Sequence, residues 1–419
     1  MREFFRTYGL ILLLVAVGFY IAVQYMAPLP PRSMKLATGV AGGVYADIGE
    51  RYRKILADEG ITLELVPTEG TAANLALLTD PKSEVDAALI QGGVGNAELQ
   101  PDLRDLGSLF LEPVWVFSRE GSRVRRLTDL ADHRIAIGQP GSGTQIVAHQ
   151  LLSASGVGPG EAELVEVGGD QAAAQLETGD VDAAFFVSAR ISPLLARLAA
   201  DHDLVLMDFD RAPAFRYALP FLSVVTLPAG TIDLPRDLPR TDITMVAPAA
   251  QLVIRNALHP ALVHLLLDAT AKVHQPRQDF APEGRFPSAT LVDYPLNSDA
   301  ARFLEKGPSF FYRYLPFWAA VWADRLLILL VPILTLMIPL FRLGPPLYRW
   351  QIQRKLFKRY RQLRRIEMAA RAEGADRDAL SGELDRLQQE LSDLKIPLAY
   401  AEDLYHLRQH ISWVRARML

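Results

Sequence analysis

Residues Lys35-Leu-Ala-Thr-Gly-Val-Ala-Gly-Gly-Val-Tyr45 open the largest part of the chain, directly after the proline-rich linker Pro28–Pro31. A short apolar run leads into a glycine-rich loop and then into an amphipathic stretch over Val44–Leu56, which is the order of a strand, a turn and a helix. The same order returns with Ile61–Val66 followed by Ala72–Leu78. This alternation predicts an α/β fold.

The alternation continues through the middle of the chain. Further strands are expected at Val85–Ile90, Val114–Phe117, Arg134–Ile137 and Val181–Phe186, with helices at Thr144–Ser153 and Gln171–Glu177. Two segments, Leu77–Ile90 and Leu176–Phe186, share the sequence Val-Asp-Ala-Ala after a turn. An alanine pair lets a helix pack closely on a strand, so the repeat is either a common packing device or the mark of two similar lobes.

Three glycine-rich loops, Gly39–Tyr45, Thr68–Asn74 and Gly138–Thr144, each lie between an expected strand and an expected helix. Glycines allow a ligand to approach the backbone, and a helix N-terminus offers free N–H groups to a carboxylate. Such turns also occur in α/β proteins without a ligand. Three of them on two lobes favour a cleft that binds a small anion.

These motifs, in this order, resemble the TAXI branch of the solute-binding subunits of tripartite ATP-independent periplasmic (TRAP) transporters. The resemblance is carried by Thr38–Tyr45, Pro67–Leu75, Glu84–Gln91, Leu111–Pro113, Gly138–Thr144 and Gly179–Phe185, and it is strongest over residues 35 to 200. It implies a type II periplasmic binding fold, in which two lobes joined by crossing strands close on a small organic acid of the amino acid or 2-oxoacid type.

The resemblance also implies which residues contact the ligand. They are Gly43, Val44, Tyr45, Thr71, Asn74, Gln91, Ser142, Thr144, Gln145 and Ser188. Many relatives have a basic residue where this chain has Gln145, so the ligand charge is matched here either by a side chain elsewhere or by backbone and helix dipoles alone. No catalytic residue, metal or cofactor is implied.

Two apolar segments suggest that the binding domain is tied to a membrane. No charged residue lies between Arg6 and Arg32, and the segment Tyr8–Val23 is read as an uncleaved anchor, with a cleaved signal peptide as the alternative. A second run, Leu326–Phe341, is expected to span with help from Pro316–Ala323, although a buried core helix was also considered.

Charge sets the expected orientation. Arg342–Arg371 carries ten Lys or Arg residues and one Glu, a net charge of +9, whereas residues 1 to 341 sum to −10 within a chain of net charge −4. The basic strip is expected in the cytoplasm against anionic lipid, or else as a solvated helix without a partner. Both termini are then cytoplasmic at a bacterial inner membrane, the large acidic domain is extracytoplasmic, and nucleic acid is not a partner.

The expected layout has five parts. They are residues 1–33 as anchor and linker, 34–118 with 219–300 as the first lobe, 119–218 as the second lobe, 301–345 as interfacial segment and second transmembrane helix, and 346–419 as a basic and helical tail. In that tail, leucines 380, 384, 387, 391 and 394 follow heptad spacing before Pro397. An intramolecular helical hairpin and a short coiled coil both fit the spacing.

The sequence is compatible to different degrees with three classes of function. The first is a tethered receptor that serves TRAP-type membrane subunits, and the second is a sensor that signals to the cytoplasmic tail. The third, an enzyme, is disfavoured: the chain has no cysteine, no Gly-x-Ser-x-Gly elbow, no phosphate-loop lysine and no His-Glu-x-x-His motif.

Overall fold

The computed structural model describes residues 13, 16–20, 24, 28–372, 376–392, 394 and 401–418. It divides into two compact units. One is Pro28–Ala323, and the other combines Met1–Ala27 with Asp324–Leu419.

Two five-stranded sheets organise the unit Pro28–Ala323. The first has the strand order β2-β1-β3-β12-β4 and the second the order β7-β6-β8-β5-β9. In each sheet three strands run parallel, and the fourth strand in the order runs antiparallel to its neighbours. The two sheets therefore repeat one topology, and the two-lobed α/β architecture predicted from the sequence is confirmed.

The strands of the first sheet are β1 (Ser33–Ala37), β2 (Thr62–Val66), β3 (Ala87–Gln91), β4 (Leu103–Leu111) and β12 (Ala249–Arg255). Those of the second are β5 (Val114–Arg119), β6 (Arg134–Ala136), β7 (Glu163–Val165), β8 (Ala183–Val187) and β9 (Leu204–Leu206). A separate antiparallel pair is formed by β10 (Ser223–Leu227) and β11 (Ile243–Ala247).

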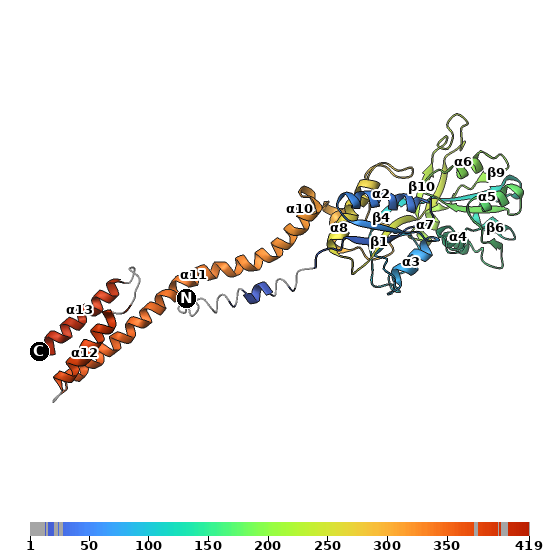
Figure 1. Ribbon diagram of the computed structural model, residues 1–419. Helices are drawn as coiled ribbons and strands as arrows, with labels where there is room; N and C mark the ends of the chain where they lie inside the picture. Colours follow the sequence, from blue (N-terminus) through green and yellow to red (C-terminus); the bar gives the residue numbers. More distant parts are fainter. Residues whose placement is uncertain are drawn as a thin grey trace. The chain divides into compact units, whose positions relative to one another are not determined.

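Helices cover both sheets, as Figure 1 shows for α2, α3 and α8 on the first and for α4 to α6 on the second. The first lobe carries α2 (Val44–Asp58), α3 (Thr71–Thr79), α8 (Pro260–His274), α9 (Ser298–Lys306) and α10 (Phe310–Tyr314). The second carries η1 (Glu120–Ser122), η2 (Leu127–Leu130), α4 (Gly143–Ala154), α5 (Gly169–Thr178), α6 (Pro193–Ala200) and α7 (Ala212–Ala218).

The repeated Val-Asp-Ala-Ala segment has the same structural role in both lobes. Asp86 accepts a hydrogen bond from the backbone N–H of Lys35 at 2.8 Å, and Asp182 accepts one from Arg134 at 2.9 Å. Each aspartate thus joins its own strand to the edge of the neighbouring parallel strand. The alanines that follow, at the start of β3 and β8, are fully buried under helices. The repeat marks two similar lobes.

The chain crosses between the lobes twice, side by side. β4 of the first sheet continues through Glu112 and Pro113 into β5 of the second, and β11 continues through Pro248 into β12. The backbone N–H of Glu112 donates to the carbonyl of Pro248 at 2.9 Å, so the two crossings are hydrogen-bonded to each other. They form the hinge of the unit.

The observed sheets differ from the expected lobe boundaries at residues 118 and 219. β5 was expected in the first lobe but pairs with β8 and β9 in the second sheet. Similarly, Val225 and Met245 of the β10–β11 pair are buried in the second lobe's core. The reason is that each crossing strand inserts into the sheet of the lobe that it enters, which a linear reading of strand order does not reveal.

The tail forms a helical cluster of its own. α11 (Phe317–Ala370), α12 (Arg377–Ser392) and α13 (Ala401–Met418) are its helices. Leu384, Leu387 and Leu391 of α12 are buried together with Leu407 and Ile411 of α13 and with residues of α11 from Ile352 to Ile366. The predicted leucine stripe is therefore covered by helices of the same chain.

Among the described residues, no helix has a stretch both long and apolar enough to cross a membrane. The expected second span, Leu326–Phe341, is helical as part of α11, but its apolar run is bounded by Arg325 and Arg342. The expected first segment, Tyr8–Val23, lies outside the described residues except for Leu13 and residues 16–20.

Candidate functional site

A pocket of 390 Å³ lies between the lobes, and we call it the cleft pocket. Its lining residues are Val40, Gly138, Gln139, Ser142, Thr144, Gly168, Gly169, Phe185, Phe186, Val187, Ser188, Ser192, Leu194 and Leu195. Val40 belongs to the loop after β1, and the others belong to the second lobe. None of these described lining residues is charged.

Three helices begin at the cleft pocket. The residues that precede α4, α5 and α6 are Ser142, Gly168 and Ser192, and all three line it. The N–H groups in the first turn of a helix have no acceptor within that helix, and the helix dipole adds positive potential there. The pocket is therefore suited to a negatively charged group although its side chains are neutral.

The two serines prepare these helix ends in the same way. The Ser142 hydroxyl accepts a hydrogen bond from the N–H of Gln145, and that of Ser192 accepts one from Leu195, each at 3.2 Å. Pro193 follows as the first residue of α6, where its missing N–H costs nothing. Each cap satisfies one N–H of its first turn, and the N–H groups of Thr144 and Leu194, both lining residues, come before the capped one.

Glycine is required where the loops of the cleft pocket meet. Gly138 has a φ of +107°, and a Cβ at this position would lie 2.8 Å from the backbone nitrogen of Gln145. A Cβ on Gly168 would lie 3.0 Å from the backbone nitrogen of Gln139. The absence of side chains thus lets the loops after β6 and β7 come together at the pocket floor.

The lobes are joined by direct contacts beside the cleft pocket. The Gln91 side-chain amide of the first lobe donates to the carbonyl of Gly143 at 3.0 Å, and Gln150 of the second donates to the carbonyl of Gly93 at 2.8 Å. Arg190, after β8, forms an ion pair with Asp47 of α2 at 3.4 Å. These contacts hold the lobes in a closed arrangement.

The sequence-predicted residues fall into separate groups. Ser142, Thr144 and Ser188 line the cleft pocket together. Val44 lines a different pocket, beside α2 and α8. Gly43 precedes α2.

Three predicted residues of the first lobe hold loops in place. Asn74 is fully buried, and its side chain donates to the carbonyl of Leu89 at 2.7 Å and accepts from Thr68 at 2.6 Å. The Thr71 hydroxyl accepts from the N–H of Gln91 at 3.2 Å. Gln91, as described above, bridges the lobes. These side chains lie behind the cleft pocket and do not line it.

Gln145, another predicted contact, is also engaged within the protein. Its side-chain oxygen accepts from the N–H of Gly141 at 2.8 Å, and its side-chain nitrogen donates to Glu166 at 2.8 Å. It stabilises the loop before α4. Any charge on a ligand in the cleft pocket is therefore met by backbone groups and hydroxyls.

Tyr45, the remaining predicted residue, points to the hinge. Its hydroxyl donates to Glu112 at 3.0 Å, and its ring meets that of Phe110 edge-on. Burial raises the pKa of Glu112 to about 8, and the hydrogen bond from Tyr45 opposes that rise. Burial, and next the charge of Glu112, holds the pKa of Tyr45 well above its ordinary value of 10.0. Glu112 is thus largely protonated at neutral pH.

Three residues of the site were not predicted from the sequence. Gly168 and Ser192 lie at the starts of α5 and α6, and a serine before a proline is a recognised helix-start signal that could have identified Ser192. Glu112 was quoted only as part of a motif, since nothing in its local sequence shows that it is buried.

Comparison with known proteins identifies the family of this chain. The sequence model of the NMT1-like family matches residues 36–270, more than half of the chain. The chain belongs to the NMT1-like family. The matched region contains the second sheet, the first sheet except the beginning of β1, the hinge and every residue of the cleft pocket.

Solved structures similar to this NMT1-like chain are distant in sequence. A protein from Bordetella bronchiseptica RB50 is 17% identical, covers 59% of this chain and 73% of its own, and has a TM-score of 0.41. The periplasmic aliphatic sulphonate binding protein SsuA from Escherichia coli is 14% identical, with coverages of 58% and 73% and a TM-score of 0.38. A putative periplasmic sulfonate-binding protein from Methylobacillus flagellatus KT is 16% identical, with coverages of 71% and 84% and a TM-score of 0.40.

Proposed function

We propose that the chain is an extracytoplasmic solute-binding receptor whose cleft pocket takes a small organic acid of the amino acid or 2-oxoacid type. The observation that carries the proposal is the convergence of three helix starts on a neutral pocket between two lobes. A carboxylate in the pocket accepts hydrogen bonds from first-turn N–H groups and from the hydroxyls of Thr144 and Ser188, while Phe185 and Leu195 contact its apolar part.

The neutral lining also restricts the ligand. An isolated positive charge in the pocket would meet the positive ends of three helices without a carboxylate among the described lining residues. A ligand ammonium group must therefore face outward from the pocket or be absent. This favours 2-oxoacids and short carboxylic acids over basic amino acids.

The test is ligand binding by the full-length protein. A panel of amino acids, 2-oxoacids, dicarboxylates and alkyl sulfonates is screened by thermal shift, because a ligand that binds only the folded state raises the melting temperature. Hits are then measured by calorimetry with Thr144→Glu and Thr144→Gln. The two variants match in size and differ in charge, and a carboxylate near the start of α4 does not disfavour the helix.

We expect Thr144→Glu to bind an anionic hit at least about tenfold more weakly than Thr144→Gln, since a like charge then faces the ligand. Thr241→Glu, at an exposed position away from the pocket, is the control and should bind as the wild type does. Equal affinities of the two Thr144 variants, or no hit in the panel, would contradict the proposal.

We further propose that the receptor delivers its ligand to TRAP-type membrane subunits, and the sequence motifs support this step. The membrane tether likewise rests on Tyr8–Val23 and on the basic strip Arg342–Arg371. Fractionation of cells with and without residues 1–27 tests the tether: the intact chain should stay with membranes after an alkaline wash. Co-purification with TRAP-type membrane subunits from a mild detergent tests the partner.

A second candidate function is a ligand sensor, favoured by a contact at the far end of α2. The loop that leads into α2 lines the cleft pocket at Val40. Glu59 follows the last residue of α2, and its carbonyl accepts a hydrogen bond from the Trp318 ring at 3.0 Å. Trp318 belongs to the first turn of α11. A movement of α2 on ligand binding therefore acts on the start of the helix that leads to the tail. A change in Trp318 fluorescence on ligand addition, lost in Thr144→Glu, would support sensing.

A further inference from the structure

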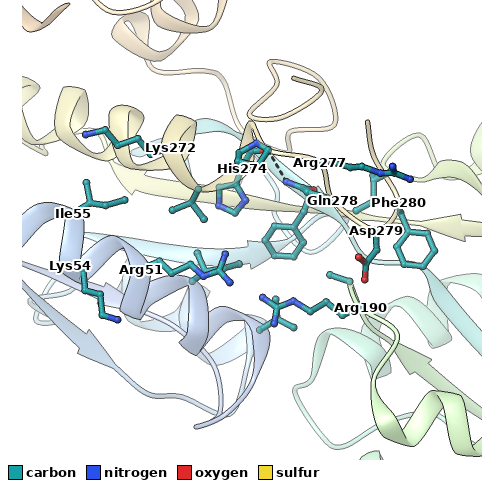
Figure 2. A pocket seen from close by; sticks show the side chains of 17 residues that line it. Arg51, Lys54, Ile55, Arg190, Lys272, His274, Arg277, Gln278, Asp279 and Phe280 are labelled. Carbon is teal, nitrogen blue, oxygen red and sulfur yellow. Dashed lines mark hydrogen bonds between the residues drawn. The ribbon is translucent and has the colours of Figure 1, made fainter. Parts of the chain in front are cut away.

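A larger pocket of 540 Å³ lies on another side of the hinge, beside α2 and α8, and we call it the cationic pocket. Its lining residues are Val44, Ile48, Arg51, Lys54, Ile55, Phe110, Leu111, Ala189, Arg190, Lys272, Val273, His274, Pro276, Arg277, Gln278, Asp279 and Phe280. Figure 2 shows Arg51 and Arg190 extending toward the middle of this pocket, with Lys54 and Lys272 nearer its rim.

Positive charge dominates the lining. Three arginines and two lysines line it with one carboxylate, that of Asp279. Two of these cations are paired with carboxylates outside the lining, Arg190 with Asp47 and Lys272 with Asp268. Within the described part of the chain, no carboxylate lies within ion-pair distance of Arg51, Lys54 or Arg277. Like charges held close together repel one another, so the pocket binds anions more strongly than an isolated arginine does.

The other side of the pocket is apolar. Ile48 and Ile55 lie on the same face of α2 as Arg51, and Phe110 of β4 and Phe280 complete the wall. A fully hydrated inorganic anion gains little from such a wall, because the apolar side chains are removed from water best by contact with the carbon atoms of a ligand. The lining therefore favours an anion with an apolar body.

His274 does not add to the charge. It is buried, and its Nε2 lies 2.8 Å from the Tyr52 hydroxyl. Burial, and next the charge of Arg51, lowers the pKa of His274 to about 3. Its ring is neutral at physiological pH and stacks on Phe110 with ring centres 5.6 Å apart. The positive charge is that of the arginines and lysines alone.

The cationic pocket is distinct from the cleft pocket. The two share no lining residue, and the segment after β8 divides them, with Ser188 on the cleft side and Arg190 on the cationic side. Arg190 comes from the second lobe, whereas Arg51, Lys54 and Lys272 come from the first. An anion in the cationic pocket would therefore contact both lobes.

We propose that the cationic pocket is a second ligand site, which takes an organic anion with two or more negative charges on an apolar or aromatic body. Guanidinium groups from opposite lobes bind separate anionic groups of one molecule, and paired N–H groups of each arginine give directional contacts. The apolar body lies against Ile48, Ile55 and Phe110. Such a ligand links the lobes across the hinge and stabilises their closed arrangement.

Trimesate, a benzene ring with three carboxylates, is the probe, and its neutral triamide and inorganic sulfate are the comparison compounds. Binding to the full-length protein is measured by calorimetry. We expect trimesate to bind and both comparison compounds to bind at least about tenfold more weakly, since each lacks either the charge or the apolar body.

Arg51→Gln is the decisive variant, with Arg53→Gln as its matched control on the same helix. Among the described residues, Arg51 has no hydrogen-bond or ion-pair partner to lose, whereas Arg53 pairs with Glu50 and does not line the pocket. We expect Arg51→Gln to weaken trimesate at least about tenfold and Arg53→Gln to change it less than about twofold.

Thr144→Glu separates this proposal from the function proposed for the cleft pocket. It should leave trimesate affinity within about twofold while it removes the cleft ligand. Trimesate binding that is lost in Thr144→Glu but kept in Arg51→Gln would overturn the second site, because the probe would then occupy the cleft. No binding of trimesate to the wild type in the millimolar range would overturn it too.

Discussion

The cleft pocket and the cationic pocket present positive potential by different means. In the cleft pocket the potential comes from backbone N–H groups at three helix starts, and its described lining carries no charged side chain. In the cationic pocket it comes from five long charged side chains around an apolar wall.

The two sources of positive potential favour different ligands. The N–H groups at a helix start are fixed in direction, and the potential of the helix dipole falls off within the first turn. They therefore suit one small carboxylate at short range. Arginine and lysine side chains are mobile and their fields reach further, so they suit larger anions and are weakened by salt. The following predictions test that contrast, beginning with the largest expected effect.

Glu112 lies at the hinge that both pockets share, and its neutralisation should have the largest effect. The native state binds its proton more tightly than the unfolded state does, because burial raises the pKa from 4.5 to about 8. The group therefore stabilises the fold below about pH 4.5, and this contribution is lost as the pH rises through 8.

Glu112→Gln, which keeps the acceptor for Tyr45, should be more stable than the wild type at pH 9 by on the order of 3 kcal/mol and little different at pH 5. Calorimetric melting at the two pH values is the measurement, and Glu120→Gln, at an exposed position, is the control. An equal difference at both pH values would show that Glu112 is not buried as described.

Gly143→Ala should separate the pockets by weakening closure at the cleft. The new Cβ would lie 2.3 Å from the side-chain oxygen of Gln91. The Gln91 side chain must then move, and its Nε2 loses the hydrogen bond that it donates to the carbonyl of Gly143 across the lobes. We expect the affinity for the cleft ligand to fall roughly 10- to 30-fold and that for trimesate about threefold. Gly121→Ala, where a Cβ meets nothing within 4 Å, should change neither. Equal losses of affinity for both ligands would show that the two pockets do not differ in their dependence on lobe closure.

Salt should act on one pocket and spare the other. Raising sodium chloride from about 20 mM to about 300 mM should weaken trimesate roughly tenfold and a monocarboxylate in the cleft by less than about twofold, because long-range interactions of exposed charges are screened. Calorimetric titration at several salt concentrations gives both slopes. Parallel slopes would mean that the two pockets recognise charge in the same way.

Ser192→Ala should have the smallest effect. Loss of the helix cap on Leu195 should cost about 1 kcal/mol of stability and lower cleft-ligand affinity about threefold, without changing trimesate binding. Ser309→Ala is the matched control, because Ser309 also precedes a helix but makes no side-chain cap. A loss of trimesate binding in Ser192→Ala would show that the pockets are coupled.

Much of the fold could be predicted from local sequence. The expected helix Val44–Leu56 corresponds to α2 (Val44–Asp58), and the expected strand Ile61–Val66 corresponds to β2 (Thr62–Val66). These elements were predictable because the spacing of apolar residues and the glycines of the turns define each of them locally. The two Val-Asp-Ala-Ala segments predicted twin lobes, and Asp86 and Asp182 make equivalent bonds in them.

The site was predictable only in part. The loop Gly138–Thr144 was located correctly, but sequence cannot tell which polar atoms are already paired, and Asn74 and Gln145 are bonded within the protein. The cationic pocket could not be foreseen at all. Its cations come from α2, from the segment after β8, and from α8 and the loop behind it, and only the tertiary fold brings them together.

The leucine stripe of α12 bears on whether the tail self-associates. Leu384 and Leu391 are fully buried against α11 and α13, so the face that a coiled coil would share between two molecules is already occupied within one. Self-association through this face would first have to open the cluster, at the cost of its packing. The tail should accordingly sediment as a species whose mass does not change on dilution.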